Sequence, residues 1–218
     1  MFALVESGKI TQMPKGNKGI QIGDVKYPAA IYTLWSEAER NAIGIYTVEI
    51  DSTNKKHEEW YNNTNITYAF SSGKVKGTYG SATAKKIADT LYTQDDVDND
   101  VYPDDYSIAS KRGKRIHTFA KDDVKTKGLK TIKKEIINKQ CAGKLAPSDW
   151  MVVKATETGE TMDSGWKTWR ASVRTKCNSM QTQIDNASDI DALVVLFTYT
   201  EQSDGSVTRP LGEFPVKE

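Results

Sequence analysis

Three aspartates at alternate positions form the stretch of this sequence that most resembles a metal site. Asp96, Asp98 and Asp100 are spaced like the first carboxylates of an EF-hand calcium loop, whose alternate side chains converge on one ion. The glycine that such a loop needs next is Val101 here, and the bidentate glutamate is replaced by Ser107. The sequence therefore predicts no EF-hand and no metal-binding residues. A weak calcium site is the alternative to a solvated acidic loop.

Side chains suited to nucleophilic or acid–base catalysis are few. His57 lies in a polar turn and His117 in a charged stretch, and neither is part of a recognisable nucleophile motif. Glu58 and Glu59 are adjacent, so on a strand they would point to opposite faces and could not flank one glycosidic bond. No nucleophile-elbow, zinc-protease, Walker or dinucleotide-binding motif occurs. We predict no catalytic residues, no cofactor and a protein that is not an enzyme.

Cysteine content, charge and hydropathy narrow the expected partners and location. Cys141 and Cys177 lie in helical patterns and are predicted to be reduced core thiols. The net charge is +1, and in the basic stretch 111–139 only His117 and Phe119 could stack on bases, so neither nucleic acid nor membrane is expected as a partner. The apolar runs are far shorter than the ~18 residues of a membrane helix. We expect a cytoplasmic protein unless an assembly exports it.

Residues 1–92 predict a small strand-rich α+β domain. Two hairpins are expected, one around the loop 6–9 and one around Gly23-Asp24, where glycine suits the first position of a type II′ turn. Ser36 and Glu39 predict a capping box at the start of a helix that Gly44 ends. Further strands are expected at 45–50 and around Trp60, Tyr61, Tyr68 and Phe70. The helical spacing of Ala82, Ala84, Ile87, Ala88 and Leu91 predicts a closing helix.

Residues 93–123 are interpreted as a charged linker, because an acidic run is followed by a basic run and Pro103 and Gly113 interrupt any regular pattern. Residues 124–200 then predict an antiparallel bundle of four helices. Its capping residues are expected to be Ser148 for the second helix and Ser188 with Asp191 for the fourth. Residues 201–218 are expected to form an extended tail.

Two apolar stripes define the expected faces of this bundle. The first helix is predicted to bury Val124, Leu129, Ile132, Ile136 and Ile137, with its lysines on the wet side. The third helix is predicted to bury Trp166, Trp169, Val173, Cys177, Met180 and Ile184. Trp150, Trp166 and Trp169 could form a sugar-binding shelf, but tryptophans at helical spacing are more often core or interhelix contacts.

The stretch Leu145–Gly159, followed by Trp169–Arg174, resembles a helical module of tailed-bacteriophage proteins. That module lies near the C-termini of tail-fibre assembly proteins and of small tail or fibre-associated structural proteins. The opening Ala3–Ile10 and the segment 34–46 are similar to theirs as well. This chain departs from the family pattern in having Lys154 where arginine is usual, and in lacking a proline near Met162.

The shared residues of the module have expected roles that stabilise the fold. Ser148 and Asp149 would cap the second helix, Trp150 would fill the gap between helices, and Glu157 would pair with Arg170 or Arg174. No active site comes with these roles.

The resemblance implies a non-enzymatic structural component of a phage virion, sited in the tail, baseplate or fibre-attachment region and present in the host cytoplasm during assembly. Its expected partners are other virion proteins, and symmetric copies of itself. One alternative is a fibre-assembly chaperone that is absent from the mature particle. Another is a receptor-binding tail protein that holds glycans through exposed Trp35, Trp60 and Tyr61.

Overall fold

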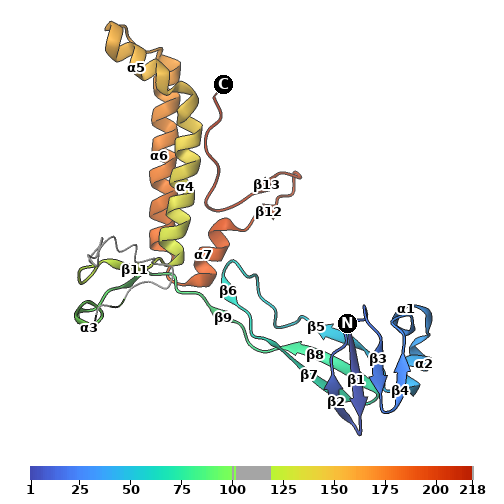
Figure 1. The fold of residues 1–218 in the computed structure, drawn as a ribbon. Helices are drawn as coiled ribbons and strands as arrows, with labels where there is room; N and C mark the ends of the chain where they lie inside the picture. Colours follow the sequence, from blue (N-terminus) through green and yellow to red (C-terminus); the bar gives the residue numbers. More distant parts are fainter. Residues whose placement is uncertain (100, 102–118, 218) are drawn as a thin grey trace. The chain divides into compact units, whose positions relative to one another are not determined.

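The computed structural model describes residues 1–99, 101 and 119–217, which form two compact units, Met1–Ala84 and Lys85–Glu218. The first unit is built mainly from strands and the second mainly from helices (Figure 1). The predicted α+β class, with a strand-rich N-terminal part followed by helices, is therefore confirmed. The first unit ends at Ala84 and not near residue 92, because Thr90 and Leu91 pair with a strand of the second unit.

A five-stranded sheet in the order β2-β1-β5-β8-β7 organises the first unit. All neighbouring strands are antiparallel except β5 and β8, and the two edge strands, β2 and β7, contact each other, so the sheet is nearly closed. Its strands are β1 (Phe2–Glu6), β2 (Lys9–Gln12), β5 (Ile45–Asp51), β7 (Ile66–Ser71) and β8 (Lys74–Tyr79).

The two predicted hairpins are present, and the backbone at their turns explains the glycines. Glu6 pairs with Lys9 across Ser7 and Gly8, which both have positive φ. The second hairpin joins β3 (Ile20–Ile22) to β4 (Val25–Tyr27), and Gly23 has a φ of 56° at the first turn position, as the sequence predicted.

Consecutive residues of β1 supply the two cores of the first unit, because neighbouring side chains on a strand point to opposite faces. Leu4 packs with Ile31 and Tyr32 of α1 (Ile31–Leu34), whereas Ala3 packs with Val48 and Val75. The Ser36–Glu39 capping box opens α2 (Glu37–Ala42) as predicted, and Gly44 follows it with a φ of 82°.

The predicted helix over residues 82–91 is wrong. This segment instead contributes β9 (Thr83–Ala84), which pairs with β6 (Tyr61–Asn62), and β10 (Thr90–Leu91), which pairs with β11 (Val124–Thr126). Between them, the carbonyls of Lys86 and Ile87 accept hydrogen bonds from the first N–H groups of α4. Pairing with distant segments therefore overrides the local helical spacing.

Four helices dominate the second unit, and two of them run side by side (Figure 1). The pair is α4 (Leu129–Leu145) and α6 (Ser164–Asn186), and α7 (Ile190–Phe197) contacts α6. A 3₁₀ turn, η1 (Ala146–Ser148), joins α4 to α5 (Asp149–Thr158). The helix α5 extends from the end of the α4–α6 pair and buries none of its residues.

The buried face of α4 differs from the predicted stripe. It consists of Leu129, Lys133, Ile137 and Cys141, at spacings of four residues. Ile132 and Ile136 are each 39% exposed, and Val124 lies on β11 before the helix begins. Lys133 was expected on the wet side, but its ammonium sits 4.9 Å from the centre of the Phe197 ring, a cation–π contact that lets the aliphatic stem be buried.

The helix α6 buries Val173, Cys177, Met180 and Ile184 as predicted, whereas Trp166 and Trp169 at its first turns are half-buried. The cap of α7 is shifted from the expected residue. Asp189, not Ser188, accepts the hydrogen bond from the backbone N–H of Ala192, and Ser188 donates its hydroxyl to Asp189.

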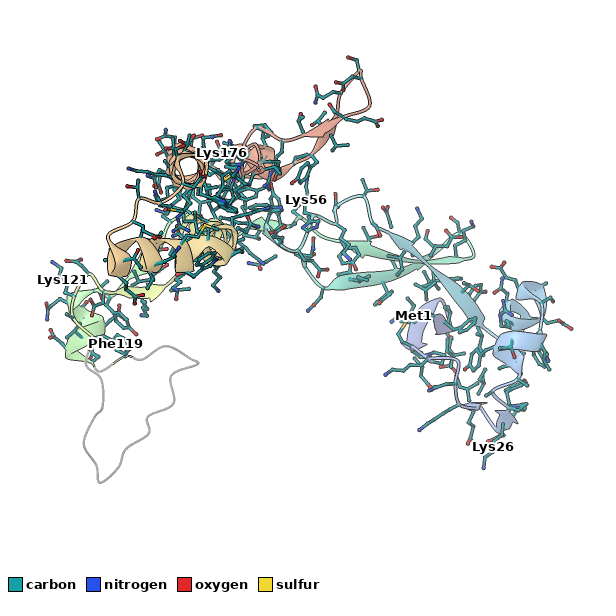
Figure 2. The ribbon with its side chains drawn as sticks, turned by 90° about the horizontal axis from the view of Figure 1, so that it is seen from above. Met1, Lys26, Lys56, Phe119, Lys121 and Lys176 are labelled. Carbon is teal, nitrogen blue, oxygen red and sulfur yellow. The ribbon has the colours of Figure 1, made fainter. Side chains whose placement is uncertain are left out.

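The predicted linker contains regular structure in its described part. Thr93 and Asp96 form a capping box on α3 (Gln94–Asp98), and Phe119 stacks on Tyr92 with ring centres 4.8 Å apart. Figure 2 shows Phe119 beside α3. Pro103, Gly113 and most of the charged runs lie outside the described residues.

The C-terminal residues do not form a free tail. The hairpin of β12 (Thr200–Glu201) and β13 (Val207–Thr208) is followed by Leu211, which is fully buried. The carbonyl of Leu211 accepts a hydrogen bond from Lys176, and that of Pro215 accepts one from the Trp169 indole N–H. The segment 209–217 therefore packs along α6.

Candidate protein-binding site

One buried arginine fixes the bend between α4 and α5. Arg170 of α6 donates Nη1 to the carbonyl of Leu145 at 2.9 Å and to the hydroxyl of Ser148 at 2.5 Å. Its Nη2 donates to Asp149 Oδ1 at 2.7 Å, which makes an ion pair. Because this guanidinium is buried and holds both sides of the bend, it sets the direction in which α5 leaves the helix pair.

The expected roles of the module residues are corrected by this geometry. Ser148 does not cap α5 with its side chain; its hydroxyl donates to the carbonyl of Leu145 and accepts from Arg170. The partner of Arg170 is Asp149 and not Glu157. Trp150 fills no gap between helices, because 59% of its surface is exposed.

The helix α5 carries large apolar side chains that nothing in the described chain covers. Trp150 and Val153 are 59% and 53% exposed, and Val152 is exposed as well. We call these three residues the α5 surface. Large exposed apolar side chains on a helix that contributes nothing to the core are typical of a surface that another protein covers.

The end of α5 and the start of α6 complete the site. Gly159 ends α5 in the left-handed conformation, with a φ of 72°, and Asp163 caps α6 by accepting from the N–H of Trp166. Met162, between the two helices, lines two surface cavities of about 310 and 400 Å³. The smaller cavity also includes Trp150 and Trp166.

Trp166 and Trp169 make structural contacts, although Trp166 also lines the smaller cavity together with Trp150. The rings of Trp166 and Trp169 meet edge to face at 5.6 Å. Lys217 lies over the Trp166 ring, and Trp169 donates to Pro215, so the C-terminal segment occupies this side of α6. The contacts of Trp166 and Trp169 agree with the prediction that these residues stabilise the fold. Trp150 disagrees with it, because its side chain is exposed.

The aspartates that resembled a calcium loop have protein partners where the structure describes them. Asp96 Oδ1 accepts from the ammonium of Lys125 at 2.5 Å, and Asp98 accepts from Gln94. Lys125 and the bonds from Thr93 lower the pKa of Asp96 to about 2. Asp100 lies outside the described residues, among which no group of three His, Cys, Asp or Glu could hold a metal ion.

The two cysteines are free thiols buried between α4 and α6, as predicted. Burial, followed by the neighbouring Cys177, raises the pKa of the Cys141 thiol to about 11. The thiol is therefore protonated at neutral pH.

The aromatic residues expected to hold a glycan are not exposed. Trp60 is only 6% exposed, and Trp35 is half-buried with its ring edge-on to Tyr27 at 5.8 Å. Tyr61 is half-buried next to the ammonium of Lys56. The structure therefore offers no open platform of these three rings for a sugar to stack on.

The other candidate residues are separated from one another. His57 is exposed and lies near Glu59, Glu58 pairs with Lys55, and His117 is outside the described residues. Several lysines of the basic stretch are engaged inside the protein: Lys130 and Lys134 with Asp185, Lys127 with Glu135, and Lys133 with Phe197. Across the described ranges, no helix combines the length and hydropathy needed to span a bilayer.

The sequence alone predicts neither that Met162 lines the two cavities nor the direction in which α5 leaves the helix pair. Met162 belongs to no periodic pattern, and the exposed side of α5 depends on the bond between Arg170 and Asp149. The only available signal was the resemblance, which covers both residues of that pair. No protein-family model, curated protein or solved structure matches this chain.

Proposed function

We propose that this protein is a non-enzymatic structural component of a tailed-phage virion, in the tail, baseplate or fibre-attachment region, and that the α5 surface binds another virion protein. The observation that carries the proposal is the exposure of Trp150, Val152 and Val153 on a helix without any buried residue. This helix lies within the stretch that resembles the phage module.

The energetics of an interface support this role for α5. Trp is among the residues that contribute most when a partner covers them, and an exposed ring on a helix held by an ion pair is already positioned for binding. The thiol of Cys141 is buried, and its raised pKa keeps it protonated at neutral pH, so it lends no support to an enzymatic alternative.

A fibre-assembly chaperone is the second candidate, because the resemblance covers both classes and a chaperone would also need an exposed apolar surface. The two candidates differ in whether the protein stays in the particle. Quantitative mass spectrometry of purified virions should find the chain in a fixed ratio to the major tail proteins. Its absence from mature particles, together with its presence in assembly intermediates, would replace the first proposal by the chaperone.

A further inference from the structure

The larger of the two cavities is a groove between α5 and α6 with two chemically different walls. Val152, Ala155 and Thr156 of α5 form a mainly apolar wall, and Thr161 and Met162 from the connection between the helices also line the groove. Lys167, Arg170 and Arg174 of α6 form the other wall. We call this cavity the basic groove. Its volume of about 400 Å³ is within the ~300–1,000 Å³ range of pockets that bind ligands or anchor side chains.

The three cations share one face of α6 because their positions are separated by three and four residues. Arg170 is buried and neutralised by Asp149. Lys167 and Arg174 are exposed, and neither has a carboxylate within ion-pair distance in the part of the chain that is described. Among the described residues no Asp or Glu lines the basic groove, so its α6 wall presents the positive charges of Lys167 and Arg174.

The chemistry of both walls decides which occupant fits. A nucleic acid would satisfy Lys167 and Arg174, but the described lining of the groove contains no aromatic ring that could stack on a base. It would also leave Val152 and Met162 facing a polar backbone. A protein segment with an apolar side chain flanked by carboxylates would cover the apolar wall and pair with both cations at once.

We propose that the basic groove binds an acidic segment of a partner protein, with one large apolar side chain between α5 and Met162 and carboxylates on Lys167 and Arg174. This inference rests on the proposed function, and it specifies the chemistry of the partner that the α5 region contacts. The basic groove shares Ala155, Thr161 and Met162 with the smaller cavity that Trp150 lines, so the groove adjoins the exposed ring of Trp150.

A display library of short random peptides, selected against the purified full-length chain, tests the proposal. The enriched peptides should combine Asp or Glu with Leu, Ile, Phe or Met. The Lys167→Glu/Arg174→Glu double variant should bind them about tenfold more weakly or worse, and peptides with Lys in place of the acidic residues should regain binding to that variant. Binding should also weaken as salt increases.

Lys139→Glu is the matched control, because Lys139 is an exposed lysine of α4 that does not line the groove. It should bind the selected peptides like the wild type. The milder Arg174→Gln, with unchanged circular dichroism, provides the same test if the double variant does not fold.

Enrichment of neutral or basic peptides, unchanged binding by the charge-reversed variants, or tighter binding of a single-stranded oligonucleotide at these residues would each overturn the proposal. These results are independent of virion mass spectrometry. The acidic-partner proposal can therefore fail while the chain is still found in the particle, and the converse also holds.

Discussion

Arg170 shows how one residue can have a structural role that its surroundings in the sequence do not reveal. A buried guanidinium is costly unless its donors find acceptors, and here a carbonyl, a hydroxyl and a carboxylate accept three hydrogen bonds from it. The sequence could predict that Arg170 makes an ion pair, but not that its partner is Asp149 instead of Glu157.

Replacing Arg170 with methionine should destabilise the helical unit by about 2–3 kcal/mol, because hydrogen bonds from a charged donor are lost and the carboxylate of Asp149 loses its cation. Urea denaturation followed by the helical circular dichroism signal measures the change. Arg174→Met, one turn further along the same helix, removes an exposed guanidinium and should change stability by less than ~0.5 kcal/mol. Equal losses in both variants would contradict the role given to Arg170.

The ion pair between Asp96 and Lys125 makes a prediction about pH. Because the pKa of Asp96 is lowered from 3.8 to about 2, its ionised form stabilises the fold above about pH 4, and this contribution is lost as the pH falls toward 2. In the Lys125→Met variant the pKa of Asp96 should rise toward 3.8. A pH titration of its carboxyl group by carbon-detected NMR measures this change. Asp204, whose lowered pKa comes from bonds with Ser206, should titrate alike in both proteins.

At the scale of elements, some local signals were predicted correctly, whereas the caps at Ser148 and Ser188 and the long-range pairings were not. The Ser36–Glu39 box and the turn at Gly23 depend on residues within four positions, so the sequence contains all the information. The strands at 83–84 and 90–91 depend on partners at 61–62 and 124–126, which local spacing cannot reveal. The buried position of Lys133 likewise depends on a ring 64 positions away, that of Phe197.

The start of α4 was missed for the same reason. Gly128 precedes the helix, and its N–H donates to Asp89 Oδ1 at 2.6 Å, while Thr131 donates to the other carboxylate oxygen. A Cβ at Gly128 would lie 2.3 Å from the carbonyl atoms of Ala88. The helix therefore begins where the segment 86–89 can approach it closely.

Gly128→Ala should destabilise the helical unit by about 1–3 kcal/mol, because backbone atoms would have to move away from the new methyl group. Gly143→Ala in the same helix is the control: nothing lies within 4 Å of its Cβ position, so the change should stabilise by roughly 0.5–1 kcal/mol. Thermal melting of both variants measures the difference in sign. Two changes of the same sign would contradict the close approach at Gly128.

Because α5 has no buried residues, a substitution on it can weaken binding without changing the stability of the fold. Val153→Ser should leave the melting temperature almost unchanged, since surface substitutions away from the core usually stay within ~0.5 kcal/mol, yet it should reduce incorporation of the chain into particles. Val195→Ser on α7 replaces a valine of similar exposure, 56%, outside the proposed site. If both variants were incorporated like the wild type, the α5 surface would not be the contact.

At the scale of the whole molecule, the division into two units means that damage to one core should stay within that unit. Ile137 is 1% exposed, so Ile137→Ala should cost the helical unit about 2–5 kcal/mol and leave the amide NMR shifts of residues 1–84 unchanged. Ile132→Ala, at a 39% exposed position of the same helix, should cost far less. Widespread shift changes in the first unit would show that the two cores are coupled.

The position of β5 between β1 and β8 has a consequence for folding kinetics. The hairpins β1–β2, β3–β4 and β7–β8 each join neighbours across a tight turn, and such hairpins form within about 1–10 μs. In contrast, β5 joins Ala3 to Tyr46 on one side and Val48 to Val75 on the other. Refolding of the first unit should therefore wait for β5 to close these two long loops. Weakening the contacts of β5 should accordingly slow refolding.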